Sequence, residues 1–143
     1  MARTNRLAAL ALSAAVLSVA GNAAAGAASA PSLVKGSSGP LSATLKPSTH
    51  TPKINTNWRL TVTATLNGKP AAHASAAYEF LFGGVPVGGT QYPFRNPHYT
   101  FTGHFSDYLT FPAAAVGQPL TLRVVVKAGG HTVNLPWSIS PHS

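Results

Sequence analysis

Side chains that could transfer a proton are scarce in this chain. Among its 143 residues only Glu79 and Asp107 carry a side-chain carboxylate. Glycoside hydrolysis by the usual route needs two carboxylates flanking the bond, so these two would have to form the pair. Alternation around Glu79 directs its side chain away from the apolar face of its segment, and Asp107 is expected in a turn. We therefore predict no catalytic residue and no enzymatic activity.

Metal and cofactor chemistry lacks donors as well. The chain has no cysteine, which excludes thiolate nucleophiles and cysteine zinc sites, and it has no Asp-rich loop for calcium. Six histidines are spread from His50 to His142. A histidine site assembled from separate strands would leave no sequence signature, so we interpret these residues as solvated or capping. We predict no metal ion and no cofactor.

The segment 91–99 is the best candidate for binding. It combines aromatic rings with an arginine, and such a combination suits stacking on sugar rings or bases with a planar hydrogen-bonding fork beside them. The alternative is that its rings cap an open end of the hydrophobic core. We predict four residues of this segment as ligand-binding: Tyr92, Arg95, His98 and Tyr99.

Residues 1–30 have the layout of a secretory signal peptide. Two arginines within the first six residues precede an apolar run from Leu7 to Ala20, and small residues follow through Ala30. Cleavage fits after Ala25 or after Ala28. The competing interpretation is an uncleaved anchor, because alanine continues the weakly apolar run. We predict an exported protein, secreted or associated with the cell wall, with no membrane span after removal of the signal.

The mature chain is small and basic. Removal of the signal leaves 143 − 30 = 113 residues, enough for one domain with a single core. Its net charge is +8 − 2 = +6, because two of the ten Lys and Arg residues lie in the signal. Such an imbalance favours polyanions. We expect an anionic cell-wall polymer or another envelope protein as partner, whereas export and the dispersed cations argue against nucleic acid.

Alternating apolar and polar residues predict β-strands throughout the mature chain. The segment 58–66 alternates strictly and ends at Asn67-Gly68, a tight-turn dipeptide. The segments 120–127 and 131–140 alternate around Gly129-Gly130, which predicts a hairpin. Pro136 has no backbone donor, so its strand should have one unpaired edge.

Weaker signals fill the remainder of the chain. Further strands are expected at 76–82, 85–87, 99–105 and 108–111, with one helical turn at 113–115. Residues 31–57 are rich in Ser, Thr and Pro and are interpreted as a tether, with a first edge strand at 41–45. The pattern predicts an all-β, antiparallel two-sheet sandwich of seven to eight short strands without a disulfide, spanning 58–143 and possibly 41–57. A closed barrel is the alternative.

Two stretches resemble bacterial extracellular immunoglobulin-like domains. The strand WRLTVTATL (58–66) is followed by NGKP, similar to the turn that ends a strand in those domains, and VGQPL (116–120) leads into the later hairpin. The mature chain is also similar to small secreted proteins of high-GC Gram-positive bacteria. The resemblance covers 41–140 and implies an immunoglobulin-like fold. Unlike antibody domains, the chain lacks both cysteines and the tyrosine of a tyrosine corner.

From these observations we expect an exported, non-catalytic immunoglobulin-like module of the cell envelope, with a structural or interaction role. The alternative function is a carbohydrate- or cell-wall-polymer-binding domain that uses the aromatic loop 91–99. Neither the composition nor the strand pattern selects a ligand, because this architecture serves many unrelated tasks.

Overall fold

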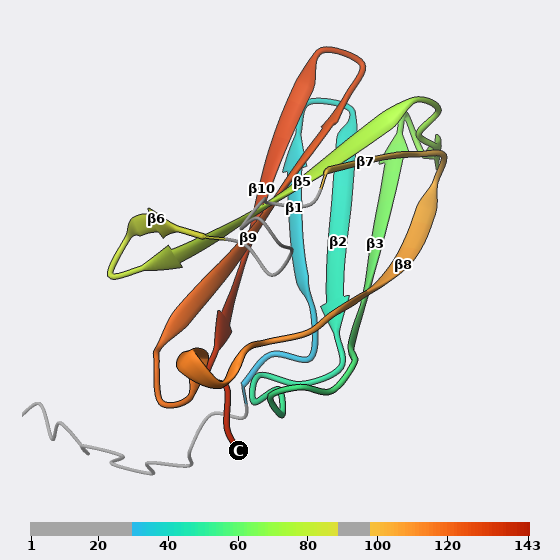
Figure 1. The fold of residues 1–143 in the computed structure, drawn as a ribbon. Coiled ribbons are helices and arrows are strands. Elements are labelled where there is room, and N and C mark those ends of the chain that lie inside the picture. Colours follow the sequence, from blue (N-terminus) through green and yellow to red (C-terminus); the bar gives the residue numbers. More distant parts are fainter. Residues whose placement is uncertain (1–29, 89–97) are drawn as a thin grey trace, which may run out of the picture.

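Two antiparallel sheets packed face to face form the protein (Figure 1). The computed structural model describes residues 30–88 and 98–143, so the predicted signal peptide and most of the segment 91–99 lie outside the described residues. The predicted all-β sandwich is confirmed, and the fold contains no disulfide because the chain has no cysteine. In the described part of the chain, no helix has the length and apolarity needed to cross a membrane.

Sheet I is the sheet that contains the first strand of the described residues. Its strands are β1 (Val34–Ser38), β2 (Leu41–Pro47), β3 (Trp58–Leu66), β4 (Lys69–Pro70) and β8 (His104–Leu109). The order is β1-β2-β3, with β8 and the short β4 sharing the other edge of β3. The predicted strand 58–66 is confirmed, and Asn67 and Gly68 turn the chain with positive φ of 53° and 74°.

Sheet II holds the C-terminal hairpin. Its strands are β5 (Ala74–Phe82), β6 (Val85–Val87), β7 (His98–Phe101), β9 (Leu120–Ala128) and β10 (His131–Ile139). The order is β10-β9-β5, with β7 and β6 sharing the other edge of β5. The hairpin around Gly129-Gly130 is confirmed, and among the described strands β10 pairs only with β9, as Pro136 predicts. One 3-10 turn, η1 (Ala113–Ala115), precedes β9.

The connections follow the immunoglobulin pattern. The chain passes from sheet I to sheet II between β4 and β5, and again between β8 and β9. In immunoglobulin domains one sheet contains strands A, B and E, and the other contains C, F and G. Here β2, β3 and β8 take the first set of places, while β5, β9 and β10 take the second.

A single core lies between the sheets. Most inward residues of the long strands are buried, as the alternation predicts, and Phe111 after β8 joins them. The largest fully buried side chains include Trp137, Tyr78, Phe111, Leu41, Leu45 and Leu60. A shared acceptor ties the sheets together at one end. The backbone carbonyl of Thr49 accepts hydrogen bonds from the indole Nε1–H groups of Trp58 in sheet I (3.1 Å) and Trp137 in sheet II (3.2 Å).

The sandwich starts earlier than the predicted tether allows. Residues 34–47 form the hairpin of β1 and β2 within sheet I. The segment 41–45 lies in β2, which has β1 on one side and β3 on the other, so it is an inner strand and not the expected edge strand. Gly36 of β1 lies against Val133 of β10, and this close approach brings the edges of the two sheets together.

The single strand expected at 99–105 is two strands. Gly103, with φ of 74°, lies between β7 in sheet II and β8 in sheet I, and its carbonyl accepts a hydrogen bond from Ala64 (2.7 Å). The expected turn at Ser106-Asp107 is also wrong, because both residues lie inside β8. Alternation in β8 then places Asp107 on the same side as Phe105 and Leu109, toward the other sheet.

Candidate functional site

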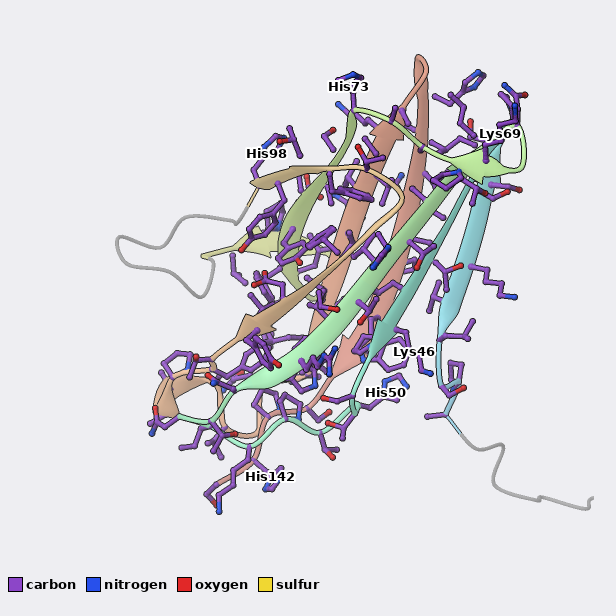
Figure 2. The ribbon with its side chains drawn as sticks, turned by 90° about the vertical axis from the view of Figure 1, so that its right-hand side faces the viewer. Lys46, His50, Lys69, His73, His98 and His142 are labelled. Atoms are coloured by element: carbon purple, nitrogen blue, oxygen red, sulfur yellow. The ribbon has the colours of Figure 1, made fainter. Side chains whose placement is uncertain are left out.

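The predicted binding residues are not brought together in the described structure. Tyr92 and Arg95 lie outside the described residues. His98 is exposed on the outer face of sheet II, where it pairs with Ala77. Tyr99, the next residue of β7, points to the opposite side and is half-buried. Figure 2 shows His98 well away from Lys46 of sheet I.

Tyr99 belongs to an aromatic cluster at the side of the core. Its ring centroid lies 5.5 Å from that of Tyr78 and 5.2 Å from that of Phe105. Burial first, and then the neighbouring Asp107, raise the pKa of Tyr99 to about 12, and the same two causes raise the pKa of Tyr78 well above its ordinary value. Among the described residues, the Tyr78 hydroxyl and Asp107 Oδ2 are buried without a hydrogen-bond partner. Of the predicted binding residues, Tyr99 therefore contributes to packing of the core.

The two carboxylates cannot act as a pair. Glu79 lies on the outer face of sheet II, opposite its apolar neighbours as predicted, and its Oε2 accepts a hydrogen bond from Nε of Arg123 at 2.6 Å. Asp107 points between the sheets from sheet I. A sheet separates the two groups, so they cannot face a common substrate bond.

Metal-ligating side chains are also dispersed. In residues 30–88 and 98–143, no group of three His, Asp or Glu side chains is placed to hold an ion. His50 has a structural role: its ring stacks on Trp137 with centroids 3.8 Å apart, and its ring nitrogens lie 2.7 Å from the Ser138 carbonyl oxygen and 2.9 Å from that of Pro31. It thus links Pro31 to β10.

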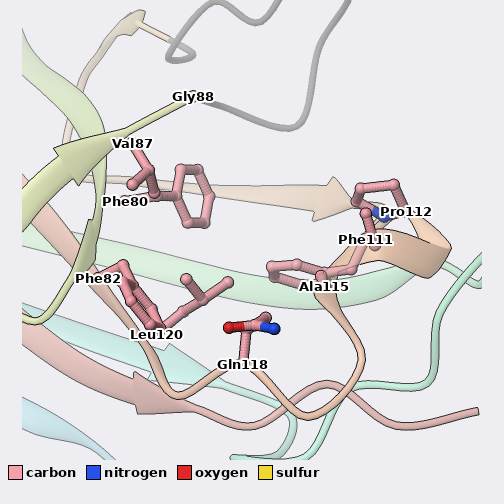
Figure 3. Close-up of a pocket in the computed structure, with 10 residues that line it drawn as sticks. Phe80, Phe82, Val87, Gly88, Phe111, Pro112, Ala115, Gln118 and Leu120 are labelled. Carbon is pink, nitrogen blue, oxygen red and sulfur yellow. The ribbon is translucent and has the colours of Figure 1, made fainter.

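An apolar pocket opens at the end of the sandwich where β5 ends and β9 begins (Figure 3). Its volume is about 320 Å³. The walls combine core rings with partly exposed side chains of the β5–β6 hairpin, and Gln118 supplies an amide. The lining residues include Phe80, Phe82, Val87, Phe111, Ala115, Gln118 and Leu120. The side chains lining this pocket include no titratable group, so it offers apolar contact but no proton transfer.

The outer face of sheet I has a different chemistry. Residues paired across neighbouring strands share a face, so the strand register shows which side chains of sheet I lie together on its outer face. We call this surface the hydroxyl–cation face; it consists of Lys35, Ser37, Ser42, Thr44, Lys46, Arg59, Thr61, Thr63, Thr65, His104, Ser106 and Tyr108. Both carboxylates of the chain lie elsewhere, because Asp107 points inward and Glu79 is on sheet II.

The hydroxyl–cation face carries open hollows. One, of about 310 Å³, is lined by Lys46, Ser48, Arg59 and Thr61 together with Pro47. A second, of about 270 Å³, lies between β1 and β2 beside Lys35. A third, of about 540 Å³, includes Thr63 and His104. Each hollow therefore combines hydroxyl groups with at least one side chain that is cationic or can become so.

Sequence reasoning missed this surface. The alternation of Trp58 to Leu66 already puts Arg59 and three threonines on one face, which was the available signal. The remaining cations of the face are far apart in sequence, and only the strand register brings them beside Arg59. The interpretation that the cations are dispersed is therefore wrong for Lys35, Lys46 and Arg59. No protein-family model and no curated protein matches this chain.

Proposed function

We propose that the protein is exported and acts at the cell envelope as a non-catalytic, immunoglobulin-like interaction module. The observation that carries the proposal is the hydroxyl–cation face. It is a surface of hydrogen-bonding hydroxyls and unneutralised cations on a sheet, and such a surface attracts anionic partners. The layout of residues 1–30 supports export.

Export is tested first. We expect residues 1–30, fused to a reporter enzyme that is active only outside the cytoplasm, to direct it out of a bacterial host. The mass of the exported chain should correspond to cleavage after Ala25 or Ala28. A reporter that stays inside the cell would contradict the export step.

Envelope binding is tested by sedimentation. Purified mature protein, mixed with envelopes of a Gram-positive bacterium in about 0.15 M salt, is expected in the pellet. A protein that stays in the supernatant at every salt concentration would contradict an envelope role. The alternative, a polymer-binding domain that uses the loop 91–99, predicts that Tyr92→Ala and Arg95→Ala release the protein from the pellet, whereas an interaction through sheet I leaves these two variants bound.

A further inference from the structure

We propose that the hydroxyl–cation face binds an extended anionic glycopolymer: a chain of polyol or sugar units with one anionic group in each repeat. This inference rests on the proposed function and names the partner chemistry of the same surface. Lys35, Lys46 and Arg59 pair with the anionic groups, and the surrounding Ser and Thr hydroxyls bond to the hydroxylated backbone of the polymer.

The three cations form a diagonal line across the sheet. Lys35 of β1 pairs with Thr44 of β2, and Lys46 lies two residues beyond Thr44. Lys46 in turn pairs with Thr61 of β3, and Arg59 lies two residues from Thr61 in the same direction. Diagonal neighbours of this kind are about 7–8 Å apart. Cations repeated along a line match a polymer with repeated anions, whereas a single small anion needs cations that converge on one point.

The charge of the line is not neutralised by the protein. In the part of the chain that the structure describes, the single ion pair joins Arg123 and Glu79 on the other sheet. Asp107 is the only other side-chain carboxylate in the sequence, and it points between the sheets. An anionic partner therefore meets no fixed negative side chain on this face, which is the complementarity that favours encounter and specificity.

The hollows contribute hydrogen-bonding groups for the hydroxylated backbone of the polymer. Arg59 contributes a planar fork of donors and Lys46 a point charge to the lining of the hollow of about 310 Å³, which also includes Ser48 and Thr61. Hydroxyls both donate and accept hydrogen bonds, as the alcohol groups of a glycopolymer require. The Thr61 and Ser106 hydroxyls already bond to each other at 3.0 Å, which fixes their orientation.

Two other macromolecules fit this face less well. Single-stranded nucleic acid is held by several aromatic rings on which bases stack, and the face offers only one, the exposed Tyr108. A membrane surface is bound by basic residues together with an apolar side that enters the lipid, and the side chains between the cations here are hydroxylated. Hydroxyls that alternate with cations favour a hydroxylated polyanion.

The test compares two double variants of equal net charge. Lys46→Glu with Arg59→Glu reverses two cations of the line. The matched variant, Lys53→Glu with Lys127→Glu, reverses two exposed lysines elsewhere, one of them on the outer face of sheet II. Binding of purified poly(glycerol phosphate) is measured by calorimetry in about 0.15 M salt, with polygalacturonate as a carboxylate-bearing polymer and dextran as a neutral one. Circular dichroism verifies that both variants fold.

We expect wild-type protein to bind at least one of the two anionic polymers and not dextran. Loss of two exposed ion pairs, with repulsion in their place, should weaken binding about tenfold in the sheet I variant, and the matched variant should stay within about twofold. A preference between phosphate and carboxylate polymers identifies the source of the anion. Equal losses in both variants would overturn the proposal, because net charge alone would then explain binding, and so would equally tight binding of duplex DNA.

Sedimentation with envelopes separates failure of this inference from failure of the proposed function. If the sheet I variant pellets with envelopes as the wild type does, the envelope role stands and the assignment to this face falls. If wild-type protein binds neither envelopes nor any polymer, both fall. Lys46→Arg keeps the charge and should retain binding, which separates a charge effect from a change of packing.

Discussion

The outer faces of the two sheets use their cations in opposite ways. On sheet II, Arg123 pairs with Glu79, Lys127 is exposed on the same face, and the other outward residues include Ala77, Leu81 and Val125. On sheet I, three cations lie among hydroxyl groups without a carboxylate. The difference does not arise from the number of cations alone. The positions of two carboxylates decide which face of a basic protein stays positively charged.

Strand alternation explains where the second carboxylate goes. Shifting β8 by one residue would turn Ser106 and Tyr108 inward and move Asp107 from the interior to the outer face. In the place of Tyr108, which pairs with Arg59, the carboxylate would lie close to that cation. The inward place of Asp107 carries a desolvation cost, because its buried Oδ2 has no hydrogen-bond partner among the described residues, yet it leaves the face without negative charge.

The largest expected effect is on stability and comes from a substitution in β1, the edge strand of sheet I. A Cβ added at Gly36 would lie 2.6 Å from Cγ1 of Val133, a buried side chain of β10. Gly36→Ala should therefore lower the free energy of unfolding by about 1–3 kcal/mol, as overpacking does. Urea unfolding measures it. Ser37→Ala, on the exposed side of β1, should stay within about 0.5 kcal/mol; equal effects would contradict the close approach.

The second prediction places a carboxylate on each face in turn. Thr61 of sheet I and Thr121 of sheet II are both half-buried strand residues with outward side chains. Thr61→Glu inserts a negative charge between Lys46 and Arg59 and should weaken binding of poly(glycerol phosphate) about tenfold, equivalent to about 1.4 kcal/mol. Thr121→Glu should change binding less than twofold. Calorimetry measures both, and similar losses would remove the distinction between the faces.

The third prediction compares a half-buried tyrosine near Asp107 with an exposed one by the pH dependence of stability. Tyrosine in the unfolded chain ionises near pH 10, whereas burial and then Asp107 raise the pKa of Tyr99 to about 12. Above pH 10 the unfolded state therefore releases a proton that the folded state keeps, and stability falls as pH rises toward 12. Tyr99→Phe should reduce this slope in urea titrations at pH 9 to 12. Tyr108→Phe, at an exposed position, is the matched variant; a slope that changes equally in both would contradict the assignment.

The smallest effect concerns the ion pair on the outer face of sheet II. Glu79→Gln removes the partner of Arg123, whose side chain is about one-third exposed. Stability should fall by only about 0.2–1 kcal/mol, because solvent screens the pair. The freed Arg123 should raise weak polymer binding by about twofold, measured as retention on a column of immobilised polymer. No change in retention would indicate that an isolated cation on sheet II does not contribute to binding.

Local patterns predicted the strands that fold locally. The segment 58–66, the hairpin around Gly129-Gly130 and the unpaired edge at Pro136 follow from alternation and turn chemistry, which depend on near neighbours in the sequence. The break at Gly103 does not. The apolar spacing of Tyr99, Phe101 and Phe105 continues through it, and only pairing with two different sheets separates β7 from β8.

The candidate site depended on distant neighbours, and sequence reasoning therefore found little of it. Asp107 follows Ser106, a pair typical of turns, and pairing of β8 with β3 outweighs that preference. Lys35, Lys46 and Arg59 belong to three strands, and a shift of one residue in any pairing would dissolve their line. Register is a property of the folded sheet, so the hydroxyl–cation face became visible only there.

Chemical-shift mapping of the polymer-bound protein tests the assignment of the hydroxyl–cation face most directly. Isotope-labelled mature protein is titrated with poly(glycerol phosphate), and backbone amide shifts are followed residue by residue. We expect the largest changes along β1, β2 and β3 around Lys35, Lys46 and Arg59, with sheet II unchanged. Changes confined to the segment 91–99, or to the apolar pocket beside Phe80 and Leu120, would contradict the assignment of binding to this face.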